Sequence, residues 1–143
     1  MDKDYRHAIV VERPVDQAFA LFTPKGEEAW VPGWRPTYVR PASGETCRDM
    51  VFMTGEGAET TIWTCLCWQP EQWHVRYLRV TPNSRVAFVT VRCHPEGPAR
   101  TRVAVTYEMV ALSDDGRSFL AGLSEDEFAR SIDAWSDMIA AMA

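Results

Sequence analysis

The sequence predicts an α+β fold in which a curved antiparallel sheet packs around a long C-terminal helix, with two short helices after the first strand. Three observations predict it: a β-branched segment ahead of a proline-started helix, six further strand-like segments, and an apolar helical stripe near the end of the chain. With 143 residues, 46% of them apolar, the chain has the size and composition of one domain with a sizeable core. We therefore expect a single domain over residues 1–143.

The N-terminal part of the chain is predicted to form one strand and two short helices. Residues 5–12 are rich in β-branched side chains, and Pro14 then stands where its fixed φ suits the first turn of a helix. Over residues 15–22 the apolar side chains recur on one helical stripe. Thr23 ends this helix and offers a cap for a second short turn that reaches Trp30.

The connection over residues 30–36 carries two large aromatic side chains among prolines and a glycine. Trp30 and Trp34 would be poor choices for a freely solvated loop, because each has a large apolar ring. We therefore expect both tryptophans to fold inward.

The middle of the chain is predicted to be an antiparallel meander. Segments rich in Gly, Pro, Asn and Ser separate apolar stretches at short, regular intervals. The predicted strands span residues 37–40, 49–54, 60–68, 73–80, 85–94 and 100–112.

The C-terminal part is predicted to be a loop followed by a long helix. Residues 113–116, Ser-Asp-Asp-Gly, have the composition of a loop, and Ser124 and Glu127 match a capping box. An apolar stripe at helical spacing follows, made of Phe128, Ile132, Trp135, Ile139 and Met142. This stripe must be buried, and the sheet is the only large partner available to it.

Charge and hydropathy restrict the partners. A net charge of −5 gives no overall attraction to phosphates, so we expect no nucleic-acid binding. The N-terminus is charged and lacks the apolar core of a signal peptide, and no run is long enough to span a bilayer. We expect a cytoplasmic protein without membrane insertion; a homodimer is compatible with the sequence.

The four cysteines are Cys47, Cys65, Cys67 and Cys93. They allow two disulfides, but reduced thiols are the better expectation without a secretory signal. Cys65 and Cys67 are separated by one residue in a predicted strand, which places both on one face and does not match the spacing of a zinc knuckle. No phosphate loop or dinucleotide fingerprint occurs, so we expect neither a metal nor a cofactor.

Several segments resemble a known superfamily. Residues 22–34 read FTPKGEEAWVPGW, and further matching pieces lie at residues 61–63, 77–86, 101–107 and 111–113. Together with the order of elements, they resemble the START-like (SRPBCC) superfamily, in particular a bacterial polyketide cyclase/dehydrase-like branch. The resemblance implies a helix-grip fold with a cavity between the sheet and the C-terminal helix. It does not select a function, because the superfamily includes cyclases, aromatases, lipid carriers, hormone receptors and co-chaperone domains.

If the sheet encloses a cavity, alternate side chains of each strand line it. In the segment 73–80 we expect the row with Tyr77 and Arg79 to face a ligand, because a phenol and a permanent cation beside apolar walls suit a carboxylate or an enolate. The alternative is that Arg79 lies in water or pairs with a carboxylate such as Glu108. The tryptophans either line the cavity or fill the core. The candidate ligand-binding residues are Trp30, Trp34, Phe52, Thr61, Trp63, Tyr77, Arg79 and Trp135.

No catalytic residue can be assigned from the sequence. His7, His74 and His94 do not stand in a recognisable catalytic spacing, and no nucleophile motif is present. Glu108 interrupts an apolar strand and is either a buried acid or an outward-facing strand residue.

Three functions remain open. The first is a binding protein that holds a small hydrophobic or aromatic ligand. The second is a cyclase- or aromatase-like enzyme in which Tyr77 and Arg79 stabilise an enolate. The third is an interaction module of co-chaperone type that uses Leu66 and Trp68 on the outer sheet face.

Overall fold

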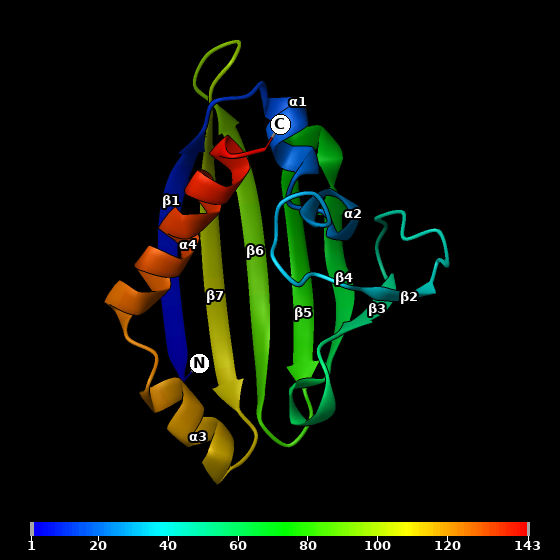
Figure 1. Ribbon diagram of the computed structural model, residues 1–143, viewed down its shortest axis with the longest axis vertical. Coiled ribbons are helices and arrows are strands. Elements are labelled where there is room, and N and C mark those ends of the chain that lie inside the picture. The colour runs from blue at the N-terminus through cyan, green and yellow to red at the C-terminus, as the bar shows by residue number, and fades with distance from the viewer. Residues whose placement is uncertain (1, 143) are drawn as a thin grey trace.

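The computed structural model describes residues 2–142 and is built on one seven-stranded sheet. The strand order is β1-β7-β6-β5-β4-β3-β2 and every pairing is antiparallel, so β2 to β7 form a continuous meander (Figure 1). The predicted meander is therefore confirmed. The strands are β1 (Lys3–Val11), β2 (Thr37–Arg40), β3 (Val51–Thr54), β4 (Thr61–Gln69), β5 (His74–Thr81), β6 (Arg85–Pro95) and β7 (Thr101–Ala111).

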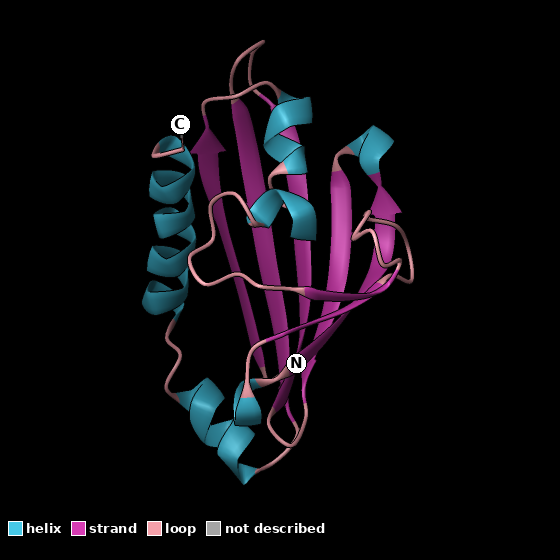
Figure 2. Ribbon diagram, turned by 45° about the vertical axis from the view of Figure 1, so that its right-hand side comes forward, coloured by secondary structure: helices cyan, strands magenta, loops and turns pink. Residues whose placement is uncertain are grey.

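The α-helices lie mainly over one face of this sheet. Figure 1 shows α1, α2 and α4 in front of the strands; in the turned view of Figure 2, α4 stands beside them, and α3 lies beyond the opposite end of the sheet from α1. The helix α4 packs along β1, and α1 packs on β6. The helices are α1 (Val15–Ala20), α2 (Pro24–Glu27), α3 (Asp114–Ala121) and α4 (Glu125–Ala140), with 3-10 turns η1 (Gly57–Glu59) and η2 (Pro70–Gln72). The α+β helix-grip class is confirmed. None of the helices between residues 2 and 142 is both long and apolar enough to cross a membrane.

The short helix α2 is fixed by its cap and by a glycine. The hydroxyl of Thr23 accepts a hydrogen bond from the Gly26 amide at 3.0 Å, which satisfies one of the free N–H groups at the helix start. Gly26 packs so close to the preceding helix that an added β-carbon would clash with the Ala20 carbonyl oxygen. The position of Glu27, the next residue, therefore depends on a glycine at 26.

We expect Gly26→Ala to destabilise the protein by about 2 kcal/mol or more, because the clash is with backbone and cannot be relieved by a side-chain rotation. Thermal unfolding measures the effect. The matched control is Gly122→Ala, whose new β-carbon would meet its nearest neighbour, the Phe119 carbonyl oxygen, at 3.6 Å. A loss of stability in the control as large as that at Gly26 would contradict the steric explanation.

The prediction that residues 113–116 form a loop is wrong, because they form the start of α3. Ser113 is the N-cap, and its hydroxyl accepts a hydrogen bond from the Gly116 amide at 3.1 Å. Asp114 and Asp115 occupy the first turn, where the helix dipole favours negative charge. Serine and aspartate favour both turns and helix starts, so composition alone did not distinguish the two.

A β-bulge in β4 changes which side chains face the helices. Cys65 pairs with Tyr77, but Cys67 pairs with Arg76, so the strand gains one residue between them. The prediction that Cys65 and Cys67 share a face is therefore wrong. Trp68 also turns inward, where its ring stacks on Phe19 with centroids 5.5 Å apart. Its predicted place on the outer face beside Leu66 is wrong for the same reason.

The long helix α4 begins and packs as its sequence predicts. The Ser124 hydroxyl caps the Glu127 amide at 3.1 Å. Phe128, Ile132 and Ile139 are buried against the sheet, whereas Trp135 is half-buried. The helix is thus buried against the sheet from its first turn to its last, and the Trp135 ring lies beside Phe22 and Trp30.

Candidate ligand-binding cavity

A cavity of about 190 Å³ lies between the helix-covered face of the sheet, α2 and α4. Strands β3 to β7 contribute to its wall, so its lining comes from most of the chain length. Seven of the eight candidate residues border this space: Trp30, Trp34, Phe52, Trp63, Tyr77, Arg79 and Trp135. A role of these residues in binding remains a prediction.

Aromatic rings form two walls of the cavity. On the side of β3 and β4, Phe52 stacks on Trp63 with centroids 5.4 Å apart, and Trp34 meets Trp63 edge-on at 5.7 Å. On the helix side, Trp30 and Trp135 meet edge-on at 5.8 Å. Both tryptophans of the loop fold inward as expected, and the indole N–H of Trp30 donates to the Leu21 carbonyl at 2.8 Å. The indole N–H groups of both tryptophans donate to backbone carbonyls, so the ring surfaces remain available to a ligand.

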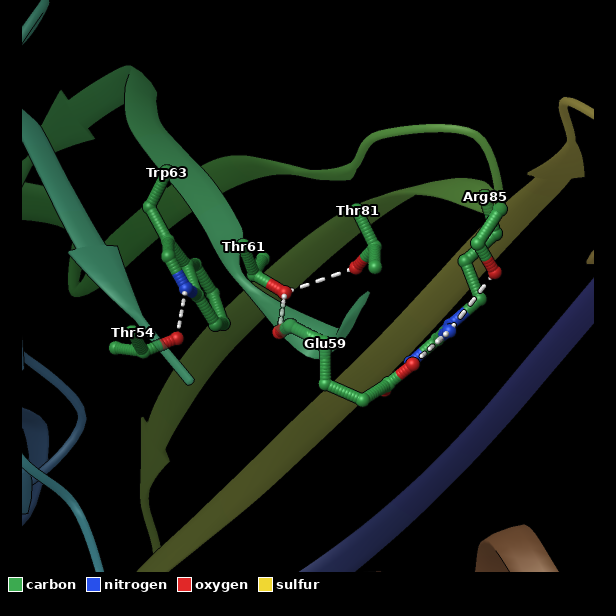
Figure 3. A network of polar contacts seen from close by, with 7 residues as sticks. Thr54, Glu59, Thr61, Trp63, Thr81 and Arg85 are labelled. Carbon is green, nitrogen blue, oxygen red and sulfur yellow. Dashed lines mark hydrogen bonds and ion pairs between the residues drawn. The ribbon is translucent and has the colours of Figure 1, made fainter. Parts of the chain in front are cut away.

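Thr61 lies outside the cavity. It is buried, and its hydroxyl is 2.8 Å from the hydroxyl of Thr81 and donates to the Glu59 carbonyl at 3.0 Å (Figure 3). Thr61 lies in the predicted strand, but its hydroxyl is hydrogen-bonded to Glu59 and Thr81 at the end of the sheet and does not reach the cavity. Thr54, which the sequence did not single out, borders the cavity instead and accepts a hydrogen bond from the Trp63 indole at 2.9 Å.

Tyr77 reaches the cavity, but its proton is already engaged. The hydroxyl donates to the Phe22 carbonyl at 2.9 Å, and burial raises the pKa of the phenol well above its usual value. The group is therefore neutral, and its donor is used by the backbone. Tyr77 consequently does not supply the free donor that the enolate hypothesis assigned to it.

Arg79 is the cation of the cavity. Its guanidinium lies over the Trp63 ring, 4.7 Å from the centroid, in a cation–π contact. Among residues 2–142 it forms no ion pair with a carboxylate. The alternative partner, Glu108, pairs instead with Arg76 at 3.6 Å, and its reading as a buried cavity acid is wrong. Arg79 therefore keeps hydrogen-bond donors that no carboxylate of the described chain occupies.

Glu27, at the end of α2, is the carboxylate of the cavity, and the sequence did not identify it. Burial raises the pKa of Glu27 from 4.5 to about 8, although the positive charge of Arg79 opposes the increase. A signal was present in the sequence: Pro24, Glu27 and Trp30 follow one another at intervals of three, and all three line the cavity. Glu27 was missed because the polar run Lys-Gly-Glu-Glu around it resembles a solvent-exposed turn.

Tyr107 of β7 is another lining residue that the sequence did not identify. Burial raises its pKa, Arg79 lowers it, and Glu27 raises it further. The influence of both charges indicates that the phenol lies near the two of them. Alternation along β7 could have suggested it, because Tyr107 shares the face of the buried Val103 and Val105.

The histidines and cysteines lie elsewhere. His7 contacts Asp133 at 2.7 Å near the surface, and His74 contacts the Gln69 side chain at 2.9 Å. All four cysteines are free, and burial raises the pKa of Cys65 and of Cys93 to about 12. Between residues 2 and 142, no cluster of His, Cys, Asp and Glu is arranged to hold a metal ion.

Comparison with known proteins establishes the fold. Neither protein-family models nor curated proteins give a match. Among solved structures, a hypothetical protein from Helicobacter pylori has a TM-score of 0.77 at 7% identity, covering 97% of this chain and 86% of that one. Norcoclaurine synthase from Thalictrum flavum has a TM-score of 0.68 at 12% identity, covering 97% and 87% of the two chains. The Zhui aromatase/cyclase from a Streptomyces species has a TM-score of 0.57 at 15% identity, covering 96% and 86%. These likenesses show that the chain shares the helix-grip fold of these proteins.

Proposed function

We propose that the protein binds a small aromatic compound with an acidic or enolic oxygen in the cavity between the sheet, α2 and α4. The observation that carries this proposal is Arg79, a cation without a carboxylate partner among the described residues, set against an aromatic wall. A guanidinium offers paired N–H donors to a carboxylate or an enolate, and such charge-assisted bonds are the strong ones. The half-buried rings of Trp34 and Trp135 would bury the apolar part of the compound.

The size of the cavity supports a compound with one aromatic ring. Its volume is about 190 Å³. An apolar cavity of roughly 150 Å³ engineered into another protein is large enough for benzene. The space therefore suits one ring with a short polar substituent.

The structural neighbours are consistent with an aromatic ligand. One structure of norcoclaurine synthase holds dopamine and hydroxybenzaldehyde, both of which contain a single aromatic ring. Another neighbour is an aromatase/cyclase. We extend to this chain only the chemical class, a small aromatic compound with polar oxygens.

Thermal unfolding with a panel of aromatic acids and phenols tests the proposal. A compound that binds only the folded state raises the unfolding temperature as its concentration rises. We expect Arg79→Met to weaken the binding of acidic compounds roughly 10- to 100-fold, because a hydrogen bond to a charged group contributes about 1.5–3 kcal/mol. The matched control is Arg76→Met, which removes a cation from the same strand where it pairs with Glu108 away from the cavity.

Two outcomes would contradict this assignment. Equal loss of binding in both variants would show that Arg79 is not the anchor. Binding by no compound in the panel would instead favour the interaction module, with the exposed Ile62 and Leu66 as its contact surface.

A further inference from the structure

We propose that Glu27 is a catalytic acid–base group that moves a proton on the carbon next to a carbonyl of the bound compound, while Arg79 holds the oxygen of the enolate. The protein would then act as a keto–enol tautomerase on aromatic ketones or keto acids. This inference rests on the proposed binding function and names its substrate class and reaction.

The two ionisable groups, Glu27 and Arg79, border one cavity from different elements. Glu27 ends α2, Arg79 lies on β5, and no ion pair joins them. A carboxylate and a guanidinium that border a shared aromatic cavity without pairing leave space between them for a ligand. A compound in this cavity would place its polar end near both groups, because both line the same space.

The surroundings of Glu27 suit proton exchange near neutral pH. Arg79 of β5 is the one cation that borders the cavity within the described chain. The titratable neighbours of Glu27 are Tyr77 and Tyr107 in the cavity and Tyr38 of β2, all phenols with raised pKa values. The lining from β3, β4, β6 and α4 is uncharged. Desolvation therefore dominates and sets the pKa of Glu27 at about 8, so both protonation states are populated close to neutral pH.

The reaction needs no further reagent. The Glu27 carboxylate takes a proton from the α-carbon, the C–H electron pair forms the C=C bond, and the carbonyl π pair moves to oxygen. The guanidinium of Arg79 donates hydrogen bonds to that enolate oxygen, and in a keto acid the neighbouring carboxylate can accept a second, parallel bond. Glu27 then returns its proton to the oxygen, which gives the enol, or to the carbon, which restores the ketone.

Deuterium exchange into phenylpyruvate tests the inference. The benzylic protons of this aromatic keto acid are replaced by deuterium at each reversible abstraction in D₂O, and proton NMR follows their loss. We expect the exchange rate with the wild-type protein to be at least roughly a hundredfold higher than with Glu27→Gln, because a positioned general base contributes about 10²- to 10⁴-fold. The wild-type rate should rise with pH and level off above about pH 8, because the carboxylate is the base. The control Glu28→Gln changes the next residue, which bonds the Tyr38 hydroxyl on the exposed side, and should exchange like wild type.

Binding is measured in parallel by thermal unfolding with phenylpyruvate, so that the two proposals fail separately. Stabilisation of both wild type and Glu27→Gln, with fast exchange only in wild type, would support the inference. Stabilisation without acceleration, or equal acceleration by Glu27→Gln, would overturn the catalytic role and leave the binding function standing. Absence of stabilisation would contradict the binding function and the catalytic role together.

Discussion

Replacing Glu27 with glutamine is expected to stabilise the protein in alkaline solution and to remove a loss of stability between about pH 4.5 and pH 8. The pKa of this carboxyl is 4.5 in an open chain and about 8 in the folded protein. In that interval the folded state binds more protons than the unfolded state, so the free energy of unfolding falls as pH rises. The contribution of the group is fully present below pH 4.5 and is lost above pH 8.

The expected size is about 2–4 kcal/mol. One pKa unit corresponds to about 1.4 kcal/mol, and we take less than the full difference because water entering the cavity would solvate the carboxylate. Urea unfolding of wild type and Glu27→Gln at pH 5, 7 and 9 measures it. The two proteins should differ most at pH 9, with the variant more stable.

Comparing the two proteins isolates Glu27 from other titrating groups. The pKa of His74 is lowered by burial and by its arginine neighbours. The protein therefore loses stability through His74 as the pH falls below 6.5, and this loss is the same in both proteins. Glu28→Gln, which changes the neighbouring carboxylate, should keep the wild-type pH dependence. A pH dependence in Glu27→Gln equal to that of wild type would show that the carboxyl is not desolvated.

The fold was predictable because its signals are local. The six meander strands lie within two residues of the predicted bounds, and turn residues and apolar runs mark them. The capping box at Ser124 likewise located α4. The bulge between Cys65 and Cys67 was missed because strict alternation was assumed through a strand that carries one extra residue. That single residue also moved Trp68 to the inner face.

The site was predictable only where side-chain alternation determines it. Arg79 and Tyr77 share the inner face of β5 because side chains alternate along the strand. The hydrogen bonds and the desolvation of each group, however, depend on residues far away in the sequence. The Tyr77 hydroxyl bonds a carbonyl 55 residues away, and Glu27 is desolvated by lining residues from five strands and α4. No pattern within the Lys-Gly-Glu-Glu run contains that information.

Filling the cavity is expected to remove binding without removing the fold. Val91 is buried on β6 and borders the cavity, so Val91→Phe would place a ring in the space that a ligand would occupy. The added apolar atoms enter an existing void, and we expect stability to stay within about 1 kcal/mol of wild type. Thermal unfolding should then give a similar transition without ligand and no increase with aromatic acids that stabilise wild type.

The control separates occupation of the cavity from general overpacking. Val103 is fully buried on β7, shares the inner face of the sheet and does not border the cavity. Val103→Phe has no void to enter, so it should cost about 1–3 kcal/mol while aromatic acids still raise its unfolding temperature. Because the two substitutions are chemically identical, opposite effects on binding and stability would assign the ligand to the cavity. Retained binding in Val91→Phe would place the ligand elsewhere, and the carboxylate and cation inside would then have no ligand to act on.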